Sequence, residues 1–100
     1  MRPKVITICG SLKFKKEMLL IARKLTIARN IVITPIFPID ENVKIKKTEK
    51  EIFDEMHKEK IKMSDTIFVV NVNGYIGNST KKEIEFAKTL NKEILYLEKI

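Results

Sequence analysis

The sequence predicts a three-layer α/β sandwich of the flavodoxin-like or Rossmann-like type, with a four-stranded parallel sheet and helices on both faces. Two observations predict this fold. Four short apolar runs, rich in β-branched residues, alternate with segments of helical periodicity. Each pair of successive runs is separated by enough chain for a crossover helix, which implies parallel pairing. We expect the strand order 2-1-3-4, as in the flavodoxin-like type. We also expect a single domain over residues 1–100, because no linker or repeat interrupts the pattern.

The first half of the chain provides two strands and one helix. The run VITIC (Val5–Cys9) is the first predicted strand, and its continuous apolar character suits a strand covered on both faces. Apolar residues then recur at helical spacing, which predicts a helix over Leu12–Arg29. IVIT (Ile31–Thr34) is the second strand, ended by a proline. Residues 35–47 contain two prolines and no clear period, so they form a loop.

The second half begins with a helix signal. Thr48 and Glu51 have the spacing of a capping box, which predicts a helix from about Glu49 to Met63. The apolar and β-branched run DTIFVVNV should be the central strand, and a Gly-rich loop follows it. That strand is Asp65–Val72, and two further elements complete the prediction: the helix Thr80–Asn91 and the strand Glu93–Leu97.

Composition indicates a soluble globular protein. Hydrophobic residues make up 44% of the chain and charged residues 33%, which is not the balance of a disordered segment. No apolar run approaches the roughly 18–20 residues that span a bilayer, so we expect no membrane partner. The start MRPKVITICG is interpreted as a first strand and not as a signal peptide, so we expect a cytoplasmic protein.

The net charge of +7 raises the question of nucleic-acid binding. The lysines are interleaved with glutamates, as in KEKIK and KKEIE, and such interleaving is typical of solvated helix faces. No aromatic platform for stacking bases is visible in the sequence. We therefore expect a general attraction for phosphate groups but no dedicated nucleic-acid partner.

The single cysteine, Cys9, excludes an intramolecular disulfide and a thiolate metal cluster. It ends the first strand, so it is either a small buried residue or a reactive thiol. Elsewhere, no group of His, Cys, Asp and Glu has metal-ligand spacing along the sequence. From the sequence we expect neither a metal nor another cofactor.

In an open parallel sheet, ligands bind beyond the carboxyl ends of the strands, where three loops meet here. One of these loops contains Gly10 and Ser11, whose backbone amides could hold an anion, or which could form a plain turn with a serine cap. Asn71 and Asn73 end the central strand and could bind a sugar or base, or simply favour a turn. Asp65 lies at the opposite end of that strand, where it should cap or pair.

Two further side chains are candidates for chemistry, and each has a structural alternative. Glu83 lies three residues after Thr80, so it could complete a capping box, but its helix also starts at the ligand-binding edge. A carboxylate near a helix N-terminus is kept ionised, as a glycosidase nucleophile requires. His57 shares helical spacing with Phe53 and Ile61, which is typical of a residue packed beside an apolar face.

Taken together, these residues resemble the nucleoside 2-deoxyribosyltransferase superfamily over nearly the whole chain. Three stretches carry the resemblance: ICGS (Ile8–Ser11), SDTIFVV (Ser64–Val70) and STKKEIEFAKTLNKEILYL (Ser79–Leu97). In the last stretch, the family has a glutamate followed by an alanine and by a lysine before the final strand, which are Glu83, Ala87 and Lys92 here. ICGS resembles the 2′-deoxynucleoside 5′-phosphate N-hydrolase branch, and the overall pattern is similar to compact, phage-type members.

The resemblance implies cleavage or transfer of the N-glycosidic bond of a (deoxy)nucleoside or its 5′-monophosphate. Glu83 would form a covalent glycosyl-enzyme, and Ser11 with its loop amides would hold a 5′-phosphate. Gly10, Asn71, Asn73, Gly77 and Ser79 would complete the pocket. The resemblance also implies a homodimer or larger homo-oligomer. Many members complete the site with a C-terminal segment of a neighbouring subunit, which we do not expect after Ile100.

This sequence departs from the family pattern at the catalytic aspartate. Eight residues before the aspartate that opens the central strand stands His57, with Asp54 one turn earlier. An imidazole that titrates near neutral pH could act as the acid or orient it, with Asp54 in support. The family's tyrosine corresponds to Thr7, and Tyr75 could replace it. The alternative hypothesis is a non-catalytic nucleotide-binding module on the same scaffold.

Overall fold

The structure is a computed structural model that describes residues 2–40 and 42–100, and it confirms the predicted fold class. Four parallel strands form one sheet in the order β2-β1-β3-β4. The strands are β1 (Val5–Cys9), β2 (Ile31–Ile33), β3 (Thr66–Val69) and β4 (Glu93–Tyr96). The helices are α1 (Lys15–Ile27), α2 (Lys47–Met63) and α3 (Asn78–Thr89), with 3₁₀ turns at Leu12–Phe14 and Val72–Gly74.

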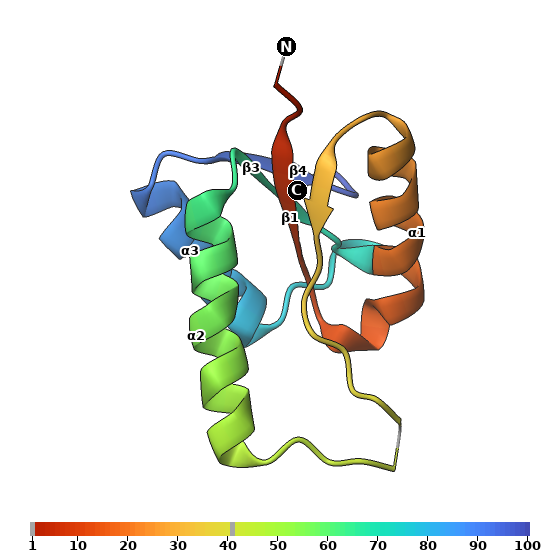
Figure 1. The fold of residues 1–100 in the computed structure, drawn as a ribbon, viewed down its shortest axis with the longest axis vertical. Coiled ribbons are helices and arrows are strands. Elements are labelled where there is room, and N and C mark those ends of the chain that lie inside the picture. Colours follow the sequence, from red (N-terminus) through yellow and green to blue (C-terminus); the bar gives the residue numbers. More distant parts are fainter. Residues whose placement is uncertain (1, 41) are drawn as a thin grey trace.

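The helices lie in two layers, with α1 on one face of the sheet and α2 and α3 on the other (Figure 1). Alternate residues of β1 supply the two cores. Ile8 packs with Met18 of α1, whereas Cys9 packs with Ile61 of α2. This alternation follows from the two-residue period of a strand, and it explains why the first strand is apolar throughout.

The central pair, β1 and β3, positions the ligand-binding edge of the sheet. Their register pairs Ile6 with Thr66 and Cys9 with Val69, so both strands finish at the same level. Beyond that level the backbone N–H of Val70 still donates to the carbonyl of Cys9 at 2.8 Å. The loops after both strands therefore leave the sheet side by side.

Several element boundaries differ from the sequence prediction because local signals compete. Helix α2 begins at Lys47, and Glu49 accepts a hydrogen bond from the Lys46 backbone N–H at 3.0 Å. The predicted Thr48–Glu51 capping box is therefore wrong, although the helix is correct. The first predicted helix starts with a 3₁₀ turn, in which Ser11 is the N-cap and accepts from the Lys13 N–H at 3.4 Å. Strand β3 ends at Val69, before the predicted Val72.

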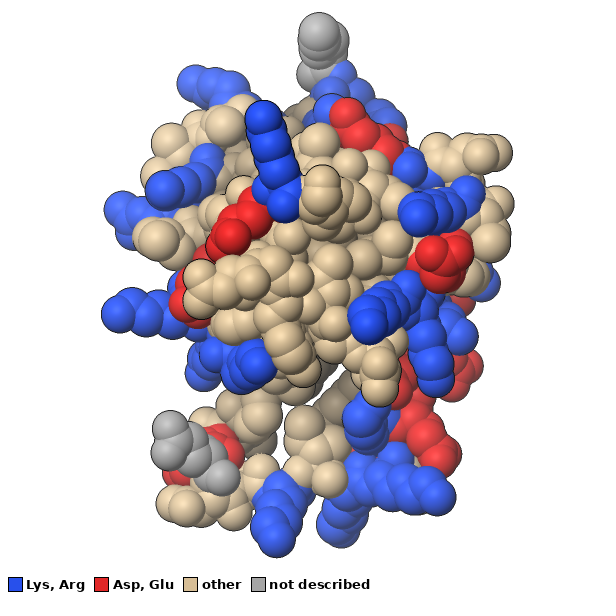
Figure 2. Space-filling model, turned by 180° about the vertical axis from the view of Figure 1, so that it is seen from behind, with Lys and Arg blue, Asp and Glu red and all other residues tan. Residues whose placement is uncertain are grey.

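The surface shows the interleaved charges that the sequence indicates. On the face in Figure 2, Lys and Arg side chains lie around a broad uncharged area, with acidic side chains between them. This face therefore offers no continuous basic groove. Within residues 2–40 and 42–100, no helix combines the length and apolarity needed to cross a membrane.

Asp65 joins the start of the chain to the amino end of β3, as its predicted position implied. Its carboxylate accepts from the Val5 backbone N–H at 2.8 Å and from the Arg2 guanidinium at 3.0 Å. The hydrogen bond from Val5, and then that from Arg2, lower the pKa of Asp65 below its usual value. The ionised carboxylate is therefore the form that the fold stabilises.

We predict that Asp65→Asn lowers the free energy of unfolding at pH 7, and that this difference disappears in acid. The lowered pKa means that the stabilisation is present above about pH 4 and is lost as the pH falls through the folded-state pKa. Urea denaturation at several pH values measures it. Arg2→Gln should lose only part of the effect, because the Val5 N–H remains; a pH-independent difference for Asp65→Asn would contradict the prediction.

Candidate active site

A cavity of about 350 Å³ opens at the carboxyl edge of the sheet, where the sequence predicts a ligand site. It lies between the turn after β1, the loop before α2, α2 itself and the start of α3. Most of the predicted site residues line it: Gly10, Ser11, Asp54, His57, Gly77, Ser79 and Glu83. Three elements that are distant in sequence thus contribute to one pocket.

The two predicted asparagines do not line this cavity among the residues that the structure describes. The buried amide of Asn71 donates to the Glu98 carbonyl at 3.0 Å and accepts from the Glu98 N–H at 2.9 Å. Asn73 adopts a positive φ of 54°, and its N–H donates to the Glu98 carboxylate at 2.7 Å. The structure therefore gives both residues the turn role that the sequence left open, fastening the chain after β4.

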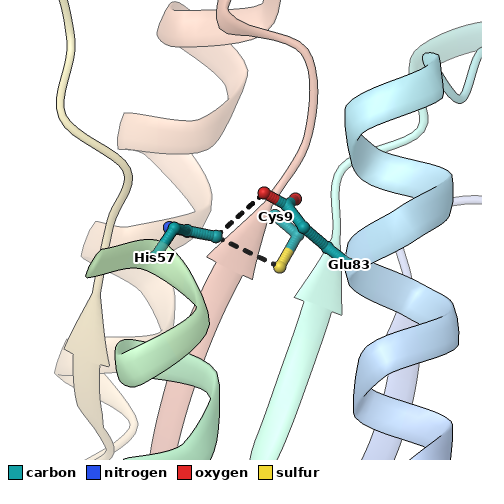
Figure 3. Close-up of side chains that lie close together, drawn as sticks. All are labelled: Cys9, His57 and Glu83. Carbon is teal, nitrogen blue, oxygen red and sulfur yellow. Dashed lines mark hydrogen bonds and ion pairs between the residues drawn. The ribbon is translucent and has the colours of Figure 1, made fainter. Parts of the chain in front are cut away.

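Glu83 points into the site and does not cap its helix. Helix α3 begins at Asn78 after Gly77, so Thr80 lies inside the first turn and is buried. Of the two alternatives that the sequence left open for Glu83, the capping box with Thr80 is not formed, because Glu83 falls in the second turn. Its carboxyl faces α2, where Oε2 lies 3.7 Å from the His57 Nε2 (Figure 3).

Cys9 is the third member of this cluster, and sequence reasoning missed it. Its Sγ lies 3.5 Å from the His57 Nε2, and the potential ligand atoms of Cys9, His57 and Glu83 all lie within 4.8 Å of one another (Figure 3). Spacing along the sequence could not reveal this cluster, since its members come from β1, α2 and α3. The alternation of side chains along β1 is the signal that could have indicated this contact, because Ile8 faces α1 and Cys9 must then face α2 and α3.

Burial controls the ionisation of all three groups. Burial, and then the negative charge of Asp54, raises the pKa of Glu83 to about 7. Burial, followed by the charge of Lys60, lowers the pKa of His57 to about 4, and burial raises that of the Cys9 thiol well above its usual value. At neutral pH the imidazole is neutral, so its contact with Glu83 is not an ion pair.

These pKa values change two sequence-based expectations. Glu83 is not held ionised by a helix N-terminus, because it lies beyond the first turn and is largely buried. His57 does not titrate near neutral pH, so it is a poor proton donor to a leaving base there. The imidazole is better suited to orient the Glu83 carboxyl, which it contacts directly.

The mouth of the cavity combines an aromatic ring with a charged pair. Tyr75 lines it, packs edge-on against Phe14, and has the Lys13 ammonium 3.5 Å from its ring centroid. Asp54 pairs with Lys50 at 2.9 Å across one turn of α2, and both line the cavity. Thr7, at the position of the family tyrosine, is buried and contacts α2 through Ser64, which leaves Tyr75 as the tyrosine at the site.

Gly10 allows the turn after β1 to lie close to β3. A Cβ atom at this position would stand 3.1 Å from the Val70 carbonyl oxygen and 3.4 Å from Met18. Backbone and a buried core residue thus leave little room for a side chain. The need for glycine here comes from close packing under the floor of the cavity.

Comparisons with known proteins support the fold. No family model and no curated protein sequence matches the chain. Among solved structures, the fold is similar to that of a 2-desoxiribosyltransferase from Leishmania mexicana, with a TM-score of 0.68 and 17% sequence identity. The match covers 94% of this chain and 63% of that one. The chain therefore has the nucleoside 2-deoxyribosyltransferase-like fold that its sequence resembles.

We predict that Glu83→Gln makes stability less sensitive to a rise in pH from 5 to 8. The folded-state pKa of Glu83 is about 7, so its stabilising contribution is present below the unfolded pKa of about 4.3 and is lost as the pH rises through 7. Relative to wild type, the variant should gain at most about 3 kcal/mol in unfolding free energy between pH 5 and pH 8.

Urea denaturation in chelator-containing buffer measures this difference. The contribution of His57 is common to both proteins and cancels to first order. Glu85→Gln, on the solvent-exposed side of the same helix, controls for the loss of a helical glutamate. A stability difference between Glu83→Gln and wild type that stays constant with pH would show that the Glu83 carboxyl does not titrate as its burial implies.

Proposed function

We propose that this protein cleaves or transfers the N-glycosidic bond of a (deoxy)nucleoside or its 5′-monophosphate through a covalent glycosyl–Glu83 intermediate. The observation that carries the proposal is the place of Glu83: a carboxyl directed into the cavity at the carboxyl edge of the sheet. The likeness to a 2-desoxiribosyltransferase supports it through the shared fold. The nucleoside as substrate follows from that likeness and from the resemblance in sequence.

The reaction has two displacements at the sugar C1′. In the first, an oxygen of the Glu83 carboxylate forms a bond to C1′ while the C1′–N bond breaks, and the base leaves with the bonding electron pair and takes up a proton. In the second, an oxygen of water or a nitrogen of another base forms a bond to C1′ while the C1′–O bond to Glu83 breaks. The acceptor releases a proton, and the free carboxylate is restored. Water as acceptor gives hydrolysis, and a base gives transfer.

His57 and Asp54 have different roles in this proposal. The neutral His57 ring orients Glu83, because its Nε2 faces the carboxyl oxygen at 3.7 Å. Asp54 lies closer to solvent in the same cavity and is held by Lys50. We propose that Asp54 helps the leaving base to take up a proton, which it would relay from water.

The turn after β1 is the proposed site for a 5′-phosphate. Ser11 lines the cavity, and its hydroxyl is engaged only by a long contact of 3.4 Å from the Lys13 N–H. The hydroxyl can therefore rotate and donate its proton to a phosphate oxygen. Gly77 and Ser79, which also line the cavity, would contact the sugar. A homodimer or larger homo-oligomer stays a prediction from the resemblance in sequence.

Base release tests the catalytic proposal directly. Wild-type protein, incubated with each deoxynucleoside and deoxynucleoside monophosphate, should release free base that chromatography detects. Glu83→Gln should reduce the rate by at least about 10³-fold, since it removes the nucleophile. Glu85→Gln should keep it, and mass spectrometry should find the trapped sugar on Glu83. The enzyme proposal fails if wild type releases no more base than Glu83→Gln on any substrate.

A second prediction concerns Ser11. Ser11→Ala should weaken binding of nucleoside monophosphates about tenfold while leaving nucleoside binding nearly unchanged, because only the phosphate loses a hydrogen-bond donor. Calorimetric titration of Glu83→Gln with and without Ser11→Ala measures both ligands without turnover. Equal losses for nucleoside and monophosphate would place the phosphate elsewhere.

One observation favours a second function, a non-catalytic nucleotide-binding module. His57 occupies the position of the family aspartate, and burial keeps its ring neutral at physiological pH. This function predicts that nucleotides raise the melting temperature of wild type and of Glu83→Ala equally, with no base released. Base release by wild type would exclude it.

A further inference from the structure

We propose that Cys9, His57 and Glu83 form a binding site for a thiophilic divalent cation, represented by Zn²⁺. The three side chains offer a sulfur, an imidazole nitrogen and a carboxylate oxygen, which are the donor types that zinc binds in proteins. They come from β1, α2 and α3 and converge on one point at the floor of the cavity (Figure 3). This inference does not rest on the proposed glycosyl chemistry.

The spacing of the donor atoms fits a tetrahedral ion. With Zn–S near 2.3 Å and Zn–N near 2.0–2.1 Å, tetrahedral angles place sulfur and nitrogen about 3.6 Å apart, and nitrogen and oxygen about 3.3 Å apart. The observed separations are 3.5 Å for Cys9 Sγ to His57 Nε2 and 3.7 Å for His57 Nε2 to Glu83 Oε2. The third pair, Cys9 Sγ and a Glu83 carboxylate oxygen, lies within 4.8 Å, so the Glu83 side chain would move to complete the triangle.

The charges also balance. A thiolate and a carboxylate together offset the two positive charges of the ion, and the imidazole binds as a neutral ligand, so the occupied site is neutral in its buried surroundings. Binding releases the thiol proton to solvent, together with the carboxyl proton where it is present. Each proton lost from a ligand is thus replaced by a bond to the metal.

The fourth position of the ion would face the cavity. His57 and Glu83 line the cavity, whereas Cys9 is fully buried behind them. Three protein ligands with one position open to solvent is the arrangement of reactive zinc sites and not of closed structural ones. The open position would hold water or an anionic or sulfur-bearing ligand from the cavity.

Cobalt(II) is the probe that tests this site, because a thiolate bound to cobalt gives a charge-transfer absorption in the near ultraviolet. The sequence contains one cysteine and one histidine, so in an untagged, reduced and chelator-treated chain such a band reports Cys9 alone. We expect the band to saturate at about one cobalt per chain and to disappear when Zn²⁺ displaces it.

Isosteric variants assign the other two ligands. Glu83→Gln and His57→Gln should each weaken cobalt binding by more than the roughly 10–100-fold typical of losing an outer-shell partner, whereas Glu85→Gln should change it by less than about twofold. Circular dichroism confirms that each variant is folded. Absence of the thiolate band, or equal affinity in wild type and folded Glu83→Gln, would overturn the metal site. Either result would leave the base-release test of Glu83 untouched.

Discussion

The parallel pairing of β1 with β3 is the constraint on which the rest of the structure depends. It brings Cys9 level with Val69. The crossovers from β2 to β3 and from β3 to β4 run in the same direction across the sheet, which carries α2 and α3 to the same face. A shift of β1 by one residue would turn Cys9 towards α1 and exchange the two cores. The contact of Cys9 with His57 therefore requires the same register that fills the interior with Ile61 and Met18.

The site illustrates how buried polar groups are accommodated without fixed charges. Among the described side chains, no buried nitrogen or oxygen lacks a hydrogen-bond partner. The His57 ring contacts both the Cys9 thiol and the Glu83 carboxyl. The raised pKa of Glu83 favours its uncharged form, so less charge has to be buried. A positive charge that develops beside Glu83, on a sugar or a metal ion, would favour the ionised carboxylate. The ionisation of Glu83 therefore depends on whether a positively charged group occupies the cavity.

The sequence predicted the fold well because the fold depends on periodicity, which local composition records. Four apolar runs and three helical periods were sufficient to give a parallel sheet with helices on both faces, and the bounds of β1 were correct. Capping was less predictable, because a helix start depends on competing local contacts. Thr80 carries a capping signature, yet α3 starts at Asn78 and buries Thr80 in the interior.

Site residues could be predicted from local pattern where they lie near the end of an element, whereas His57 and Asp54, in the interior of α2, were predicted only through the resemblance. Gly10, Ser11 and Glu83 follow strand ends or helix starts, and all line the cavity. The role of Asn71 depends on Glu98, a partner at the far end of the chain that no local pattern identifies. Cys9 was recognised as buried, but its neighbours come from two helices whose approach is a tertiary property.

Cys9 distinguishes the two functions proposed for this cavity, because metal binding uses its thiol and glycosyl transfer does not. Displacement at C1′ needs Glu83 and a group to orient it, and any small apolar residue could fill the place of Cys9. The thiol adds a soft donor 3.5 Å from the same His57 nitrogen that Glu83 contacts, and a thiophilic ion would use that donor. One carboxylate cannot coordinate a metal and attack a sugar together, so the two ligands compete. By linkage, zinc would weaken substrate binding by the same factor by which substrate weakens zinc binding.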